Sequence, residues 1–305
     1  MAFPPRCRVE PRPHHSFAFI LDGNEVACWH FGGDHPRPFL FPMRGPSGRS
    51  LTRIGHPGAP NHDHHLSVWF AHASVAGIDF WSNKPGPSIR QKEWLAQEDG
   101  DRQAVLAVRL AWNDGHDAAD LLEQDVVFAA SPISDRGEWS LEIQAMLRPT
   151  SPTLVFQKTN FGLLAVRVAR EVSEHFGSGR ITGSSGKTGE TALFNQPNAW
   201  MDYSCAEAGH EEGITLIDHP ENPGHPARWH VRADGWMGPS LTRTDEITLN
   251  REKPLVLRYL LVAHSGLADP PGIKIRADSF AKSNRWIVSR STRPHRFNEV
   301  RRSGE

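Results

Sequence analysis

The sequence predicts an all-β protein built as a large antiparallel β-sandwich, on the strength of three observations. Short apolar segments recur along the chain and are separated by turn residues. One segment, residues 139–147, alternates apolar with mainly polar side chains, which is the period of a half-buried strand. The 24 prolines and 26 glycines disfavour long helices.

The expected strands follow one another along the chain. Residues 16–21 and 26–31 flank the sequence Asp22-Gly23-Asn24-Glu25, which is typical of a hairpin around a glycine-containing turn. Only residues 91–97 suggest a short helix, and no other amphipathic helix pattern is present. The remaining strands are expected at residues 103–112, 121–128, 139–147, 153–168, 213–217, 227–231 and 255–263.

Three stretches are too polar and too rich in glycine and proline for strands. They are residues 41–65, 174–198 and 219–227. We expect them to be long loops, and loops on a rigid sheet commonly carry function. A single β-sandwich domain is expected at residues 1–289, followed by a charged C-terminal arm at residues 290–305 that is peripheral or disordered.

The overall charge excludes some classes of partner. The chain has 34 Lys+Arg and 35 Asp+Glu, a formal net charge of -1, so no basic field favours nucleic acid or an anionic membrane. No stretch approaches the roughly 18 consecutive apolar residues that cross a bilayer, and no secretory apolar segment begins the chain. We expect a soluble, cytoplasmic protein that acts on a small-molecule or oligosaccharide substrate. The sequence is compatible with either a monomer or a homo-oligomer.

Five of the 17 histidines fall within seventeen consecutive residues. Imidazole is the commonest metal ligand and a natural acid or base near neutral pH. If the chain is extended from His62 onward, His62, His64 and His72 share one face of the strand. His65 then lies on the other face with Trp69. Two of these histidines and a distant partner could hold one divalent metal, because catalytic zinc takes three protein ligands.

A second polar cluster supplies that distant partner. Asp218 and His219 begin it, and the alternation of residues 227–232 places Arg228, His230 and Arg232 on one face. Two guanidiniums beside an imidazole suit an anionic or hydroxyl-rich ligand. The set predicted for the metal is His62, His64 and His230.

Several motifs resemble those of the DUF6807 family, which also carries the labels PmoA-like and methane oxygenase. Where that family has Asp-His-Pro-His-His, this chain has Asn61-His62-Asp63-His64-His65. The methane label is rejected because particulate methane monooxygenase is a membrane protein. The resemblance implies a galactose-mutarotase-like supersandwich and a role in carbohydrate breakdown. It extends over residues 42–49, 67–72, 77–81, 159–164, 200–203, 218–223 and 229–232.

Together these observations predict a carbohydrate-active enzyme with a histidine-rich pocket. Elimination, epimerisation and hydrolysis of a sugar or glycoside all fit, with or without a metal. A noncatalytic carbohydrate-binding protein and a metal-dependent jelly-roll oxygenase stay open, the latter needing two histidines and one carboxylate. The predicted catalytic residues are His62, His64, His72, Lys158 and His230, and the predicted substrate-binding residues are Asn160, Trp69, Arg232, Asp218 and His219.

Overall fold

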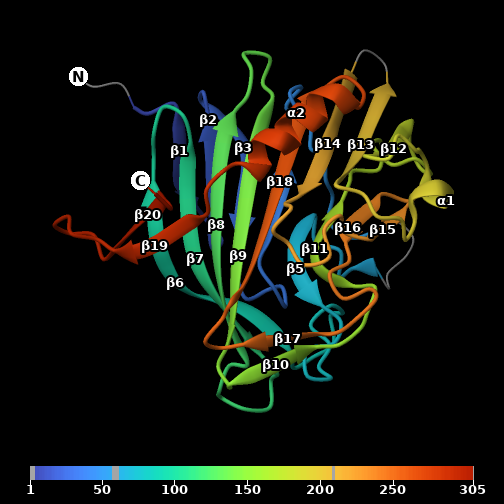
Figure 1. Cartoon of the computed structure of the whole chain (residues 1–305). Coiled ribbons are helices and arrows are strands. Elements are labelled where there is room, and N and C mark those ends of the chain that lie inside the picture. Colours follow the sequence, from blue (N-terminus) through green and yellow to red (C-terminus); the bar gives the residue numbers. More distant parts are fainter. Residues whose placement is uncertain (1–3, 57–61, 208–209, 305) are drawn as a thin grey trace.

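A computed structural model describes residues 4–56, 62–207 and 210–304. Two eight-stranded antiparallel sheets dominate the structure, as Figure 1 shows, and their facing sides enclose the hydrophobic core. The predicted all-β class and the large antiparallel architecture are therefore confirmed.

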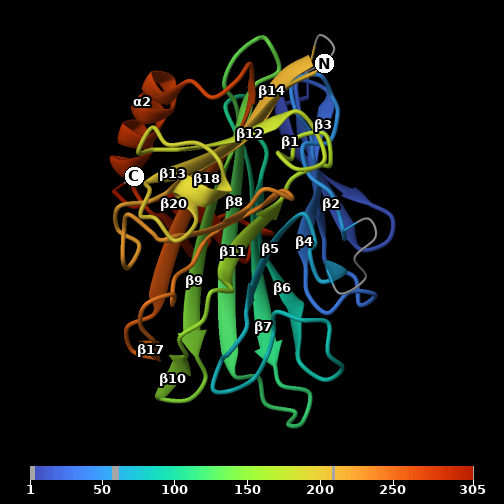
Figure 2. The same ribbon diagram turned by 90° about the vertical axis from the view of Figure 1, so that its right-hand side faces the viewer.

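The first sheet has the strand order β1-β2-β3-β4-β5-β11-β16-β15. Its later strands come from distant parts of the chain, so that β5 pairs with β11 and β11 with β16. In Figure 2, β4, β5 and β11 run beside one another through the middle of the molecule. The strands are β1 Cys7–Arg12, β2 Ser16–Leu21, β3 Asn24–His30, β4 Phe39–Met43, β5 Val68–His72, β11 Gly162–Arg167, β15 Trp229–Arg232 and β16 Trp236–Pro239.

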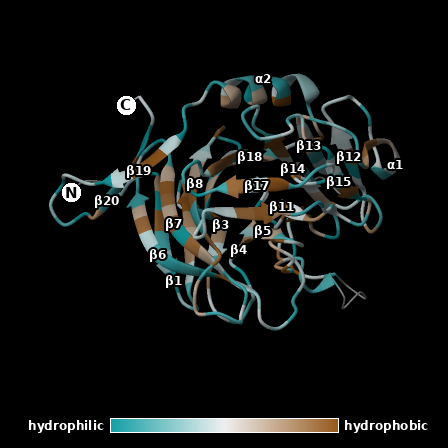
Figure 3. Cartoon of the chain, turned by 60° about the horizontal axis from the view of Figure 1, so that its bottom comes forward, coloured by the Kyte–Doolittle hydropathy of each residue, from teal (hydrophilic) through white to brown (hydrophobic). Residues whose placement is uncertain are grey.

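The second sheet has the order β12-β13-β14-β18-β9-β8-β7-β6. Hydrophobic and hydrophilic bands alternate along β6 and β7 in Figure 3, as expected where the two faces of a strand differ. Its strands are β6 Ser88–Glu98, β7 Ala104–Asn113, β8 Leu122–Pro132, β9 Trp139–Pro149, β12 Gly179–Gly183, β13 Trp200–Glu207, β14 His210–Asp218 and β18 Leu255–Ser265.

Four short strands and two helices complete the described chain. Strand β10 (Thr153–Phe156) pairs with β17 (Ile247–Asn250), and β19 (Trp286–Arg290) pairs with β20 (Asn298–Arg302). The helices are α1 (Glu190–Leu193) and α2 (Pro270–Ala281). Within the described residues, neither the length nor the apolar character of any helix suffices to cross a membrane.

Strand β9 shows why the second sheet is buried on both faces. Leu141 and Ile143 face the core between the sheets and are fully buried. Glu142 and Gln144, on the face predicted to be polar, are also buried. The main chain of Trp286 exchanges two hydrogen bonds of 2.8 Å with the Gln144 side chain. The C-terminal hairpin thus covers a sheet face that the sequence pattern assigns to solvent.

Two helix predictions were wrong, for separate reasons. The helix suggested for residues 91–97 is part of β6, where two β-bulges interrupt the pairing with β7. A bulge adds a residue to one strand, so the alternation of apolar positions is lost. Helix α2 was not expected, because no amphipathic pattern marks it, and it begins with Pro270 and Pro271. They occupy the first helical turn, where the missing N–H groups are not needed. Ile273 and Phe280 bury its inner face.

Gly213 on β14 lies beneath the ion pair between His264 and Asp202, whose Nε2 and Oδ2 atoms are 2.8 Å apart. A Cβ atom at Gly213 would lie 2.6 Å from the Cβ of Ser204 and 2.8 Å from His264 Cε1. We expect Gly213→Ala to lower the free energy of unfolding by about 1–3 kcal/mol in urea titrations.

The matched control for this substitution is Gly33→Ala. No atom lies within 4 Å of a Cβ built at Gly33, so its unfolding free energy should change by about 0.5 kcal/mol or less. Equal stability of the two variants would contradict the close packing at Gly213.

Candidate functional site

The candidate site lies on the outer face of the first sheet, on β5, β11, β16 and β15. Arg167 is the register partner of Trp236, and Trp236 is the register partner of Arg232. Their neighbours Val166 and Val231 belong to the core between the sheets. Because side chains alternate along a strand, Arg167, Trp236 and Arg232 form one row on the opposite, outer face.

A second row on the same face lies two residues further along these strands and continues onto β5. Trp69 on β5 pairs with Ala165 on β11, and His230 on β15 pairs with Gly238 on β16. The two middle residues are small, and a Cβ at Gly238 would lie 3.6 Å from Trp236 Cζ2. The Trp236 indole therefore lies over the small residues, between Trp69 and His230.

Six side chains form what we call the aromatic–histidine cluster. The ring centroids of Trp236 and His230 are 3.9 Å apart, and those of Trp236 and His65 are 6.3 Å apart. Trp236 thus separates two imidazoles. Phe161, 37% exposed, borders the cluster at the protein surface. The members are His65, Trp69, Trp81, Phe161, His230 and Trp236.

Unpartnered polar atoms concentrate at this place. In the part of the chain that the structure describes, fourteen buried side-chain nitrogens or oxygens lack a hydrogen-bond partner. Nine of the fourteen belong to this region. Because buried polar groups are otherwise almost always paired, the concentration points to a site for a polar ligand or ordered water. They are Arg53 Nε and Nη1, His65 Nδ1, Trp69 Nε1, Arg167 Nε and Nη2, His230 Nδ1, Trp236 Nε1 and Arg243 Nη1.

Both imidazoles of the cluster are neutral at neutral pH. Burial, followed by the charges of Arg243 and Arg232, lowers the pKa of His230 to about 3. Burial, followed by the other histidines and Arg167, lowers the pKa of His65 still further. A hydrogen bond with the main chain of Asn160 partly opposes the shift at His230. A neutral imidazole with one open ring nitrogen can accept a proton or a hydroxyl hydrogen.

Arg53, Arg167 and Asp234 adjoin the cluster. Arg167 Nη1 donates to Asp234 Oδ1 over 2.8 Å, and Arg53 Nη2 donates to the Asp234 carbonyl oxygen over 2.8 Å. Burial raises the pKa of Asp234, but Arg167, His56 and His62 together bring it below its usual value. Burial, followed by Arg167, lowers the pKa of Arg53 to about 10.

A cleft of about 810 Å³ opens beside Arg53. Arg53 and His56 line it together with Thr52 and Asn83. His56 Nε2 lies 3.4 Å from Asp234 Oδ2. The cleft therefore gives solvent access to Arg53, whereas Arg167 is fully buried and does not line it.

His62 and His64 lie near the site, although not in the predicted way. Residues 62–64 form a turn, and the strand begins only at Val68. Ser67 has a φ of 63°, a left-handed conformation that resets the alternation of faces. His64 and His65 have ring centroids 4.3 Å apart, and those of His62 and His65 are 5.1 Å apart. Asn61 of the same motif lies outside the described residues.

The structure does not bring His72 to the site. Its Nδ1 accepts from the Ser74 N–H over 3.1 Å, and its Nε2 lies 2.8 Å from Thr242 Oγ1. The ring is fully buried and stacks on Phe156 in the core between the sheets. The alternation of side chains along β5 correctly predicted that His72 and Trp69 lie on opposite faces of the strand. The candidate site, however, is on the face of Trp69.

Three more predicted residues lie at the edge of the site. Lys158 and Asn160 are exposed in the connection between β10 and β11. The Asn160 carbonyl accepts from Ser240 Oγ over 2.7 Å. Arg232 is half-exposed, and its Nη1 lies 3.1 Å from Glu190 Oε1. These residues lie on the surface around Phe161 and not on the buried floor.

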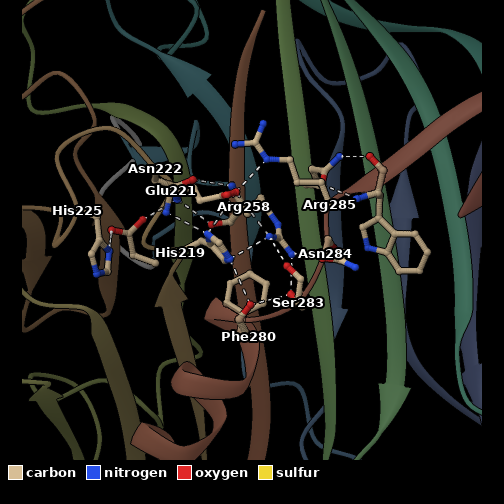
Figure 4. A network of polar contacts seen from close by, with 12 residues as sticks. His219, Glu221, Asn222, His225, Arg258, Phe280, Ser283, Asn284 and Arg285 are labelled. Carbon is tan, nitrogen blue, oxygen red and sulfur yellow. Dashed lines mark hydrogen bonds and ion pairs between the residues drawn. The ribbon is translucent and has the colours of Figure 1, made fainter. Parts of the chain in front are cut away.

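Asp218 and His219 belong to a different network, shown in Figure 4. Asp218 accepts from Asn222 Nδ2 over 2.7 Å and from His225 over 2.9 Å. His219 Nε2 lies 2.9 Å from Arg258 Nη1. Both are almost fully buried, and their hydrogen bonds hold the loop after β14. Asp218 also lines a separate pocket of about 420 Å³, and the substrate-binding role of both residues stays a prediction.

The predicted metal set does not assemble. Among the described residues, no group of three or more histidine, cysteine, aspartate or glutamate side chains converges to hold a metal ion. These residues therefore do not fit the metal centre expected at His62, His64 and His230, nor the iron site of an oxygenase. Metal binding stays a prediction, which element analysis of the purified protein would test.

Sequence reasoning missed His65, Arg53 and Arg167. His65 was assigned to the far side because the chain was taken as extended through Ser67. Arg167 ends the apolar strand β11 and is fully buried. The sequence did offer one indication of Arg167, a charged residue at the end of an otherwise apolar strand. A buried arginine needs a partner, so such a position is a candidate for a polar site.

Comparisons with known proteins give a family match and a distant structural match. A family model described as "Family of unknown function (DUF6807)" matches residues 16–277. No curated protein matches the chain. Among solved structures, one match is the crystal structure of "a putative mutarotase (YeaD) from Salmonella typhimurium", at 12% identity and a TM-score of 0.36. The alignment covers 85% of this chain and 96% of that one.

Proposed function

The chain belongs to the DUF6807 family, and we propose that it is a carbohydrate-active enzyme that moves a proton on a bound sugar. The observation that carries the proposal is the pair of buried, neutral imidazoles, His65 and His230, on either side of Trp236. Each has an Nδ1 atom without a partner among the described residues. Both lie on a floor made largely of indole rings.

The unpartnered atoms favour a ligand rich in hydroxyl groups. The indole N–H groups of Trp69 and Trp236 can only donate, whereas a neutral imidazole offers one accepting nitrogen. A hydroxyl both donates and accepts, so a sugar can satisfy both kinds of atom at once. Indole rings also supply large apolar contact area, and ligand sites commonly combine aromatic walls with a few placed polar groups.

The protonation state favours a base over an acid. Because burial lowers the pKa of His230 to about 3, its imidazole is unprotonated before the reaction. A neutral imidazole removes a proton, whereas glycoside hydrolysis begins with an acid that supplies one. Among the reactions expected from the sequence, epimerisation and elimination therefore fit better than hydrolysis. Arg243 and Arg232, whose charges act on His230, would stabilise the developing negative charge.

Proton exchange provides the test. The protein is incubated in D2O with aldoses, uronic acids and their methyl glycosides, and NMR follows loss of carbon-bound hydrogen and any unsaturated product. We expect exchange or elimination on at least one substrate. His230→Asn should lower kcat about 100-fold or more, the usual contribution of a general base.

His116→Asn is the matched control, because His116 is exposed in the loop between β7 and β8. It should retain the full rate, and both variants should have the melting temperature of the parent to within a few degrees. A sugar that binds without exchange, elimination or cleavage would contradict the enzyme and indicate a noncatalytic binding protein.

A further inference from the structure

The arginine end of the site has more buried positive charge than negative charge. Arg167 is fully buried, and Arg53 is largely covered. Asp234 gives its carboxylate to Arg167, while Arg53 reaches only its main-chain carbonyl. Of the exposed neighbours, Glu171 raises the pKa of Arg53 and Arg170 lowers it, so their charges oppose one another. Among the described residues, Arg53 thus has no carboxylate within ion-pair distance, and Arg167 has one, the 28%-exposed Asp234.

The guanidinium nitrogens that lack a hydrogen-bond partner can only donate. Arg167 Nε and Nη2 and Arg53 Nε and Nη1 have no partner among the described residues. A guanidinium has no accepting atom, so only acceptors can complete these four positions. A buried charge without a partner is costly, and arginine recognises planar carboxylates through two parallel hydrogen bonds. An anionic oxygen pair matches what is missing.

This donor set is continuous with the aromatic–histidine cluster. Arg167 stands beside Trp236 in the same row of the sheet, and its charge contributes to the low pKa of His65. Arg53 lines the cleft of about 810 Å³. Arg167 therefore connects the indole floor with the cleft-lining Arg53, because it adjoins Trp236 in the sheet and shares Asp234 with Arg53.

We propose that the substrate is an acidic sugar whose carboxylate is bound by Arg53 and Arg167. This inference rests on the proposed function for its sugar ring and adds the anionic group. Two arginines discriminate a sugar acid from the matching neutral sugar, because the neutral sugar leaves the guanidiniums unpaired. Binding of an anion there also offsets the positive charge that acts on His65, so the imidazole becomes a better base when substrate is present.

Calorimetric titration of the full chain with matched ligands tests the assignment. The probes are glucuronate, galacturonate, mannuronate and gluconate, their neutral counterparts glucose, galactose and mannose, and glucose 6-phosphate. At least one carboxylate should bind about 10-fold or more tightly than its neutral counterpart. That preference should weaken as salt is raised.

Three variants locate the effect. Arg53→Gln should weaken binding of the preferred acid about 10- to 100-fold and leave the neutral sugar unchanged. Arg167→Lys keeps the charge, and so protects folding, but loses the planar fork and should also weaken the acid. Arg102→Gln, at an exposed loop arginine, is the control and should bind as the parent does.

The outcomes separate the two proposals. Equal affinity for acidic and neutral sugars, or acid binding unaffected by Arg53→Gln, overturns the carboxylate assignment even if proton exchange occurs on neutral sugars. Tighter, arginine-dependent binding of glucose 6-phosphate assigns the anion as phosphate and overturns the carboxylate. Arginine-dependent binding of a uronate or gluconate without turnover supports this inference while the enzyme proposal fails.

Discussion

Replacing Glu142 by glutamine is expected to lower the free energy of unfolding by about 3–5 kcal/mol. Glu142 is buried on the outer face of β9, where Arg258 Nη2 lies 3.1 Å from its Oε1 and Arg302 Nη2 lies 2.5 Å from its Oε2. Arg258 is only 1% exposed. The amide would leave that buried guanidinium with only the half-exposed Glu221, 3.9 Å away, as a carboxylate partner. Removing the close partner of a buried ion pair is strongly destabilising.

The same substitution should loosen the C-terminal hairpin. Arg302 lies on β20, and its guanidinium also stacks 3.8 Å from the ring centroid of Trp286. Without the Glu142 carboxylate, β20 loses its ion pair to the sandwich. Faster amide hydrogen exchange across residues 286–302 would report this loss.

Glu221→Gln is the matched control within the same network. Glu221 is half-exposed, pairs with Arg285 at 2.9 Å and lies 3.9 Å from Arg258 Nη1. Such exposed carboxylates contribute about 0–1 kcal/mol. Urea denaturation of both variants makes the comparison. A loss at Glu142 no larger than that at Glu221 would show that the buried carboxylate does not hold the network together.

Mild acid is expected to destabilise the protein through His72. Burial lowers the pKa of this imidazole from 6.5 to about 4. Above pH 6.5 it is neutral in both the folded and the unfolded chain. As pH falls below 6.5 the unfolded chain gains a proton that the folded chain does not, so stability is lost until about pH 4. A pKa difference of about 2.5 corresponds to about 3 kcal/mol in full.

The packing around His72 explains why it stays neutral. A Cβ at Gly162, whose φ is 148°, would lie 2.4 Å from His72 Cδ2, so only glycine lets the ring fit there. Because Nδ1 accepts the Ser74 N–H, the single ring proton is on Nε2 and points at Thr242. Both nitrogens are satisfied by the neutral ring, and a second proton would displace Ser74.

His72→Gln removes the titration without adding charge. Between pH 7 and pH 5 the unfolding free energy of the variant should fall by about 2 kcal/mol less than that of the parent. His116→Gln, at an exposed position, should reproduce the parent curve. Parallel curves for the parent and His72→Gln would contradict the prediction. His230, with a pKa lowered to about 3, adds acid sensitivity in the same direction.

Most strands could be predicted from local sequence patterns. The hairpin at residues 16–31 appears as β2 and β3, and the segments expected near residues 103–112, 121–128 and 139–147 appear as β7, β8 and β9. Alternation and turn residues act within a few positions of the chain, so they can be seen without the fold. The two bulges of β6 interrupt the alternation of apolar residues, and the prolines of α2 obscure the start of a helix, so both elements escaped prediction.

The site depended on contacts that no local pattern contains. The sequence by itself determined an all-β sandwich, a histidine-rich segment, and the alternation that separates Trp229 and Val231 from His230 and Arg232. Only the tertiary structure selected His65 over His72, because the left-handed Ser67 resets the strand face. It also brought Arg53 and Arg167 to the indole floor. Paired residues of β5 and β11 are 90–98 positions apart in sequence and those of β11 and β16 are 69–71 apart, so these strands become neighbours only when the sheet forms.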